Sequence, residues 1–352
     1  MLIIISYIGF SGFIRLITLN STKKKSFIYI SGATLFIIAA LRSVYFGSDP
    51  IGYVLSYRKL SYQSLSSLWF NLINYSGKDP FFSFFSKILN MSGVSAQLWL
   101  AILSGIFIFS VSKLIYKYSD EPYISYISLI SLGYFYFSLT GLRQATAIAI
   151  ILLSYKYLRE RKLLNFILFV LFASLFHASA LIFLIAYPIS QININIKQII
   201  GIISALMITI YFSSFIRQII RYIAWTETIA SYADRQVTLN YSGFIIQFAI
   251  FIFCWAFKDK VLEKDHKNIT LYNLLFLGLV FQSFSTIVAE FFRVSYYFSI
   301  FNIILIPKAI DVIDHKGLKM YVYLVILSIF IIYFLRSGSF QEFAFFWEQP
   351  FY

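Results

Sequence analysis

Long apolar runs alternate with short polar segments along most of the chain. Each run is close to the ~20 residues that a transmembrane helix needs. The runs occupy residues 1–20, 26–45, 94–115, 122–139, 142–158, 163–189, 198–216, 242–257, 268–289, 294–310 and 317–335. This pattern predicts an all-α polytopic membrane protein, a single integral-membrane domain with about 11–12 transmembrane helices.

Short basic clusters between the runs predict which ends of the helices face the cytoplasm. They lie at residues 23–25, 113–117, 156–162, 258–267 and 307–319. Because cytoplasmic loops carry an excess of Lys and Arg, we assign these clusters to the inner side. Two long loops, 46–93 and 214–241, and the tail 336–352 then fall on the outer, periplasmic side.

The run at 163–189 does not fit a single straight helix. Its 27 residues would extend roughly 40 Å as an α-helix, whereas the hydrocarbon core is ~30 Å thick. Basic segments also flank it on both sides, which a single crossing would not allow. We therefore expect a broken helix, interrupted near residues 176–180 at His177. Non-helical backbone at membrane depth is tolerated where it is buried in protein or lines a wet cavity, so the break is a candidate site.

The loop 46–93 contains two helix-start signals, Asp49-Pro50 and Asp79-Pro80. Asp is favoured at the N-cap and Pro in the first turn of a helix. Residues 79–91 place most of their Phe side chains on one side and Ser, Lys and Asn on the other. This pattern is typical of a helix in the membrane interface, which either rests on lipid or covers a cavity.

Composition supports the membrane prediction and excludes several functional classes. The chain is 60% hydrophobic and 12% charged, against about 25% charged in soluble domains. Its net charge of +14 comes mostly from the predicted cytoplasmic loops, so it indicates topology rather than nucleic-acid binding. Cys254 is the only cysteine, and no cluster of His, Cys or carboxylates has metal-ligand spacing. We expect no metal and no nucleotide cofactor.

Arg143 is the first candidate for binding a substrate. It follows a predicted outer turn at residues 138–141 and lies in the first turn of the next helix. A helix N-terminus together with a guanidinium is a phosphate-binding arrangement, and no carboxylate is nearby in the sequence. An external anion is therefore its expected partner. The alternative is an arginine that extends to lipid headgroups.

His177 is the only histidine inside an apolar run. It could act as an acid or base or contact a phosphate, or it could be a buried histidine whose hydrogen bonds are satisfied within the protein.

Two pairs of charged residues are further candidates. Glu290 and Arg293, spaced i and i+3, form either a local ion pair or part of a site. Arg217 and Arg221, spaced i and i+4, repel each other unless an anion lies between them.

Further polar residues on the outer side are candidates for sugar binding. Asp234 and Arg235 occupy a polar stretch of the loop 214–241. Tyr296 could stack on a sugar ring or belong to the aromatic belt at the membrane surface.

Four segments carry a resemblance to a known family. They are "LRSVYFGSDPIGY" (41–53), "GLRQATAIAI" (141–150), "RERKLLNFILFVLFASLFHASALIF" (159–183) and "RVSYYFSIFNIILIP" (293–307). In this order they resemble the EpsG-type branch of bacterial polysaccharide polymerases, related to the O-antigen polymerase Wzy. The resemblance places the family's arginines on Arg42, Arg143 and Arg293, its acidic position on Asp49 and its histidine on His177. Gln144 follows Arg143 in the same motif.

The resemblance implies a glycosyltransferase of the bacterial inner membrane that works on the periplasmic side. Such enzymes transfer glycan from undecaprenyl diphosphate to the non-reducing end of another lipid-linked repeat unit, building O-antigen or exopolysaccharide. The implied partners are the undecaprenyl-diphosphate-linked oligosaccharide, the lipid bilayer and a chain-length regulator protein. On this hypothesis Arg143, with Arg293 and either Arg217 or Arg221, holds the diphosphate. His177, or failing that Asp49 or Glu290, accepts the proton of the attacking hydroxyl.

Two alternatives remain open. A flippase for lipid-linked glycans should carry cationic residues at several depths, whereas those of this chain gather at the predicted outer side. A glycan ligase would share the diphosphate-binding arginines and differ only in its acceptor. A membrane acyltransferase is disfavoured, because its histidine would face a cytoplasmic acyl donor.

Overall fold

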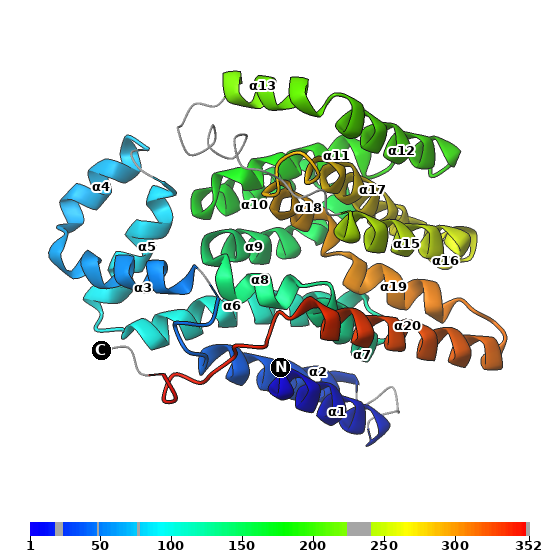
Figure 1. The fold of residues 1–352 in the computed structure, drawn as a ribbon, viewed down its shortest axis with the longest axis horizontal. Coiled ribbons are helices and arrows are strands. Elements are labelled where there is room, and N and C mark those ends of the chain that lie inside the picture. Colours follow the sequence, from blue (N-terminus) through cyan, green and yellow to red (C-terminus); the bar gives the residue numbers. More distant parts are fainter. Residues whose placement is uncertain (18–23, 48, 76–77, 224–240, 350–352) are drawn as a thin grey trace. The chain divides into compact units, whose positions relative to one another are not determined.

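The computed structural model describes residues 1–17, 24–47, 49–75, 78–223 and 241–349. These residues form helices and no β-strand beyond one isolated bridge (Figure 1). The chain divides into two compact units. Unit 1 comprises Met1–Lys156, Leu164–Leu181 and Ile313–Tyr352, and unit 2 comprises Tyr157–Leu163 and Ile182–Val312. The predicted all-α membrane fold is confirmed.

Unit 1 contains the longest helices of the chain. Its elements are α1 (Leu2–Ile17), α2 (Lys24–Ala40), α3 (Pro50–Lys59), η2 (Leu60–Tyr62), α4 (Leu65–Ile73), α5 (Pro80–Met91), α6 (Ala96–Tyr118), α7 (Pro122–Ser131), α8 (Tyr134–Thr140), most of α9 (Leu142–Arg159), α10 (Leu163–Phe176) and α20 (Lys316–Ser337), with the start of η3 (Ala178–Ile185). Helix α2 packs along α6, and α20 packs against α7.

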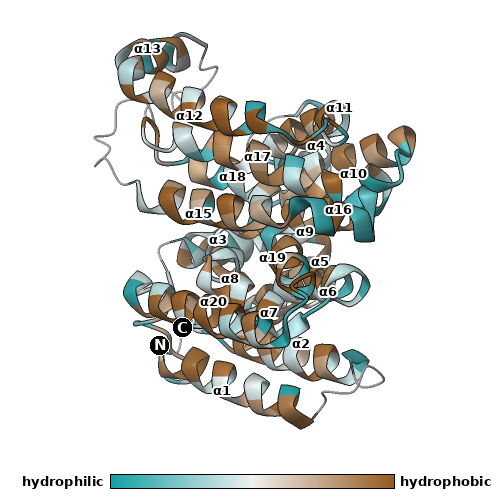
Figure 2. Ribbon diagram, turned by 90° about the vertical axis from the view of Figure 1, so that its right-hand side faces the viewer, coloured by the Kyte–Doolittle hydropathy of each residue, from teal (hydrophilic) through white to brown (hydrophobic). Residues whose placement is uncertain are grey.

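Exposed apolar helix faces in unit 1 indicate contact with lipid. Helices α6 and α20 are long and apolar enough to cross a membrane. Within the most apolar stretch of α20, only 11% is buried inside the protein. Figure 2 shows hydrophobic residues along α1 and α20. Leu324 and Ile332 on α20 are each more than half exposed. A soluble protein rarely leaves so continuous an apolar surface open to water.

The helices of the loop 46–93 begin where the sequence predicts. Helix α3 starts at Pro50 and α5 at Pro80, but neither preceding Asp side chain caps its helix. Helix α5 buries part of its polar side: Ser86 and Lys87 are buried, and Lys87 Nζ donates to the carbonyl of Leu60 at 2.6 Å. Ile88, on the apolar side, is 46% exposed. Phe82 is buried as well, and Phe81 and Phe85 contact Phe176, so α5 packs into unit 1 through both polar and aromatic side chains.

A C-terminal strap, residues 338–348, completes unit 1. Its backbone pairs with the segment after α2: Ser43 N donates to Ala344 O at 2.8 Å, and Phe346 N donates to Leu41 O at 2.9 Å. Phe340 is fully buried, with its ring centre 5.1 Å from that of Phe46. The strap is thus part of the core of this unit.

Unit 2 consists mostly of shorter helices. They are α11 (Ala186–Ile189), α12 (Ile196–Tyr211), α13 (Ser213–Ile223), α15 (Ser242–Ala256), α16 (Lys258–Lys264), η4 (His266–Asn268), α17 (Ile269–Phe284), α18 (Phe291–Ser299) and α19 (Asn302–Asp311). Helix α17 packs against α12, α15 and α18. Its hydrogen-bonded polar residues, including Gln282 with Gln247, join the helices inside the unit.

Several predicted spans are interrupted in the structure. The run 122–139 divides into α7 and α8 at Gly133, which adopts a φ of 82°. The run 294–310 divides into α18 and α19. The run 198–216 bends by 83° after Tyr211, so that α13 begins inside what the sequence predicts as a span and continues into the predicted loop 214–241. If that bent pair is one span, the described part of the chain has three helices or helix pairs that are long and apolar enough to cross a membrane.

The predicted break in the run 163–189 is confirmed. Helix α10 ends at Phe176, His177 is not helical, and a 3₁₀-helix, η3, begins at Ala178. The amide of His177 still donates to Ala173 O at 3.2 Å, and the amide of Ala180 donates to His177 O at 3.0 Å. His177 therefore occupies the junction between two kinds of helix.

Candidate functional site: an Arg–Asp–His cluster

Arg143 lies at the start of α9, a helix whose residues are mostly buried. Gly141 makes the close turn from α8 possible, because a Cβ there would lie 2.7 Å from the ring of Phe137. Beyond Arg143, nearly every side chain of α9 down to Tyr155 is buried, so the helix is fixed on all sides. The guanidinium thus projects from a rigid support.

The Arg143 side chain is only 18% exposed. Its Nη1 lies 3.4 Å from Oδ2 of Asp79, a long ion pair. Its guanidinium carbon is 5.5 Å from the ring centre of Tyr53 and 5.6 Å from that of Phe82, within the range of cation–π attraction. Its Nε is buried and makes no hydrogen bond to the described residues. Arg143 therefore keeps donors available for another acceptor.

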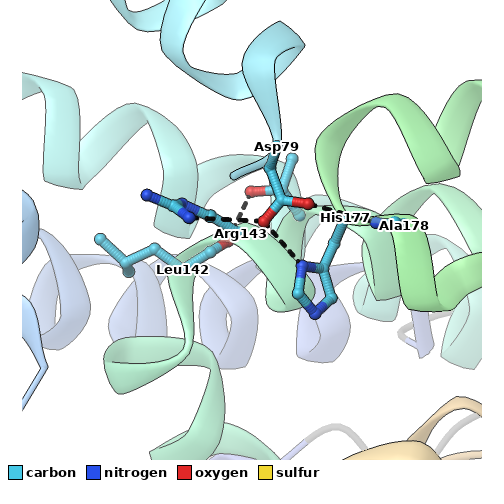
Figure 3. Close-up of polar contacts among 6 residues, drawn as sticks. Asp79, Leu142, Arg143, His177 and Ala178 are labelled. Carbon is cyan, nitrogen blue, oxygen red and sulfur yellow. Dashed lines mark hydrogen bonds and ion pairs between the residues drawn. The ribbon is translucent and has the colours of Figure 1, made fainter. Parts of the chain in front are cut away.

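Asp79 occupies the centre of the cluster, as Figure 3 shows. Its Oδ2 is 2.9 Å from Nδ1 of His177, and its Oδ1 accepts a hydrogen bond from the backbone of Ala178 at 3.3 Å. The residue is only 5% exposed. Its backbone has a φ of 52°, a left-handed conformation that Asp tolerates better than most residues. In this conformation the carboxylate contacts the broken helix instead of capping α5.

The pKa of Asp79 is lowered from its ordinary value. Burial alone would raise this pKa. The hydrogen bond and positive charge of His177, the charge of Arg143 and the amide of Ala178 outweigh the burial. Asp79 is therefore a carboxylate at neutral pH, and it accepts hydrogen bonds without donating any.

His177 presents its second ring nitrogen away from Asp79. Its side chain is 23% exposed, and its Nε2 makes no hydrogen bond to the described residues. An imidazole held by a carboxylate at one nitrogen and open at the other is suited to accept a proton.

Aromatic side chains hold α5 against α10 beside the cluster. The ring of Phe176 makes edge contacts with Phe81 and Phe85, at centre-to-centre distances of 5.0 and 5.6 Å. Phe81 also contacts Phe172. These contacts lie directly next to Asp79 and His177 in the sequence, so they fix the distance between the two residues.

Not all the predicted site residues join this cluster. Gln144 is next to Arg143 but buried, Asp49 precedes α3, and Arg42 is fully buried. Glu290, Arg293 and Tyr296 belong to unit 2 at the start of α18, and Arg217 and Arg221 lie on α13. Asp234 and Arg235 lie outside the described residues. Their roles stay predictions.

The structure corrects the expectation that Arg143 has no protein carboxylate as partner. The sequence marks Asp79 as a helix-start residue and does not single it out as the partner of Arg143. Asp79 is separated from Arg143 by 64 positions and from His177 by 98, so no local spacing could reveal the contact. Among the described residues, no group of three or more His, Cys, Asp or Glu side chains could hold a metal ion.

The fold and the cluster define an all-helical membrane protein with a charged, partly buried site that retains free donors. The chain belongs to the EpsG family, whose model matches residues 25–347. The predicted resemblance is thereby confirmed. No curated protein and no solved structure matches the chain. Family membership supports a polysaccharide polymerase-type function and a glycosyltransferase-like enzyme associated with a membrane.

Proposed function

We propose that this protein polymerises a bacterial polysaccharide from lipid-linked repeat units on the periplasmic side of the inner membrane. The donor is a glycan on undecaprenyl diphosphate, and the acceptor is the non-reducing end of a second lipid-linked unit. The observation that carries the proposal is the meeting of Arg143 and His177 around Asp79 in a chain of the EpsG family.

Arg143 binds the donor diphosphate. The guanidinium keeps Nη2 for phosphate oxygens while Nη1 contacts Asp79. As the bond between the anomeric carbon and the diphosphate oxygen breaks, negative charge grows on that oxygen. A partly desolvated guanidinium fixed on α9 stabilises this charge more than a solvated one would.

His177 accepts the proton of the attacking sugar hydroxyl at Nε2. The hydroxyl oxygen forms the new bond to the anomeric carbon, and undecaprenyl diphosphate departs. The energy comes from the glycosyl–diphosphate bond, so the reaction needs no nucleotide and no metal.

The test is a polymerisation assay with purified protein and the lipid-linked repeat unit, read as a product ladder on a gel. Arg143→Lys should lower the rate at least ~100-fold, because a lysine cannot form the planar, paired contacts of a guanidinium. Arg58→Lys, an exposed arginine on α3, is the matched control and should keep the wild-type rate. A normal ladder from folded Arg143→Lys would contradict the proposal.

The same assay separates polymerase from ligase and flippase. A polymerase extends lipid-linked units without any other acceptor. A ligase releases single units onto a different acceptor, and a flippase yields no new glycosidic bond.

A further inference from the structure

Asp79 makes more of its contacts with the broken helix than with Arg143. Its two oxygens contact neighbouring residues, Oδ2 at 2.9 Å from His177 Nδ1 and Oδ1 at 3.3 Å from the amide of Ala178. The contact with Arg143 is longer, at 3.4 Å. The carboxylate is thus held by two consecutive residues, at the point where α10 ends.

This geometry determines which nitrogen of His177 carries the proton. A carboxylate can only accept, so the short contact requires that Nδ1 donates. In the neutral imidazole Nε2 then has a free lone pair. The backbone amide of Ala178 prevents the carboxylate from turning, because it occupies the second oxygen.

We propose that Asp79 is a positioning residue that holds His177 in the Nδ1–H tautomer, so that Nε2 can accept the proton of the acceptor hydroxyl. The role in catalysis rests on the proposed function, whereas the tautomer itself does not. When Nε2 takes the proton, the imidazolium is stabilised by the adjacent carboxylate, which itself stays unprotonated. The proton leaves to solvent after undecaprenyl diphosphate departs.

Docking of α5 is part of this arrangement. Asp79 immediately precedes Pro80, the first residue of α5, and Phe81 and Phe85 fix that helix on Phe176, next to His177. A carboxylate at the end of a loose loop would not hold one tautomer. Phe81→Ala should therefore weaken the same tautomer preference without touching either polar residue.

The direct test is the tautomer of His177 by ¹⁵N NMR of histidine-labelled protein at alkaline pH, where free imidazole is neutral. The His266→Gln/His315→Asn background leaves one histidine, and Asn keeps the N-cap of α20 that His315 provides. We expect Nδ1–H in this background and a shift to Nε2–H in Asp79→Asn, whose amide donates to Nδ1. Asp259→Asn, with a side chain 79% exposed, is the matched control and should not change the spectrum.

The kinetic test separates positioning from folding. Asp79→Asn should lower kcat by about 10²–10⁴-fold with KM changed less than about 3-fold, as expected for a wrong tautomer. Asp79→Glu should recover part of kcat, because it restores a carboxylate.

Two results would overturn the positioning role: Nε2–H as the main tautomer in the wild-type residue, or an unchanged spectrum in Asp79→Asn. If Asp79→Asn does not fold, the spectrum of the background protein and of Phe81→Ala still decides. A protein that shows the tautomer shift but makes no polymer contradicts the proposed function alone.

Discussion

Arg42 and Arg143 are both predicted site residues in apolar surroundings of unit 1, but they differ in burial and in the groups that accept their hydrogen bonds. The Arg42 guanidinium is fully buried and donates to neutral oxygens: the carbonyl of Ala39, Oγ of Ser104 at 2.9 Å and the carbonyl of Leu139 at 3.3 Å. Arg143 is partly exposed, contacts a carboxylate and keeps two nitrogens without a hydrogen bond to the described residues.

The difference shows that the acceptors, and not the apolar surroundings, distinguish a structural arginine from a binding one. Oxygens of Ala39, Ser104 and Leu139 accept from both terminal nitrogens of Arg42, which leaves only its buried Nε without a hydrogen bond to the described residues. The strap pairs with the backbone of Arg42 through an isolated bridge to Phe345. Arg143 has a single, long protein contact and open donors. We therefore expect stability to depend on Arg42 and activity to depend on Arg143.

The largest effect is expected for Arg143→Ala. It should lower the polymerisation rate at least ~10³-fold, about 4 kcal/mol of transition-state stabilisation, because the leaving diphosphate loses its cation. Its Tm in detergent should fall less than that of Arg42→Ala, because Asp79 keeps His177 and the amide of Ala178 as partners when the long contact with Arg143 is lost. A large fall in Tm, measured by thermal unfolding, would remove the contrast with Arg42.

Phe340→Ala should give the next largest effect, on stability. The fully buried ring packs with Phe46, Phe135 and Phe334. Its removal should cost about 3 kcal/mol through lost transfer energy and a cavity. Thermal unfolding measures this, with the exposed Phe346→Ala on the same strap as control. An equal Tm for both variants would mean that the strap is not part of the core.

Arg42→Ala should lower the free energy of unfolding by about 2 kcal/mol. The substitution leaves a cavity and removes the donor to Leu139 O, and the loss of a buried charge offsets part of the cost. The measurement is the Tm in detergent beside that of Arg143→Ala. If Arg42→Ala keeps its Tm and loses only activity, the two arginines have the same role and the comparison fails.

The smallest effect concerns pH. Because the folded-state pKa of Asp79 lies below its ordinary value of 3.8, its carboxylate stabilises the fold fully above that value. This stabilisation is lost as the pH falls through the lowered folded-state pKa. The Tm difference between wild type and Asp79→Asn should therefore stay constant near neutral pH and close only below pH 3.8. A difference that closes at higher pH would contradict the lowered pKa.

Local signals in the sequence predicted the backbone around the site better than its contacts. The two Asp-Pro pairs predicted where α3 and α5 begin, and the excess length of the run 163–189 predicted the break at His177. The chemistry at Asp79 was missed. Its sequence suggests an N-cap, but its left-handed backbone directs the carboxylate to residues far along the chain.

The interruptions inside other runs were not predictable from hydropathy. Apolar residues continue through Gly133 and through Tyr211, so the runs 122–139 and 198–216 look continuous although the helices end or bend there. Hydropathy indicates whether a segment partitions into lipid or water, whereas a bend depends on how the helix packs against other helices. The strap was likewise hidden, because its partner residues 41–43 lie some 300 positions away.

The strap also constrains the order of assembly during synthesis. Unit 1 needs Ile313–Tyr352, which the ribosome makes after the whole of unit 2. The segment at Leu41–Ser43 must therefore wait, with its backbone groups unmatched, until the downstream helices have been inserted. Until then Ser43 N and Leu41 O lack these two partners, and a fusion that delays release of the C-terminal segment would prolong the incomplete state.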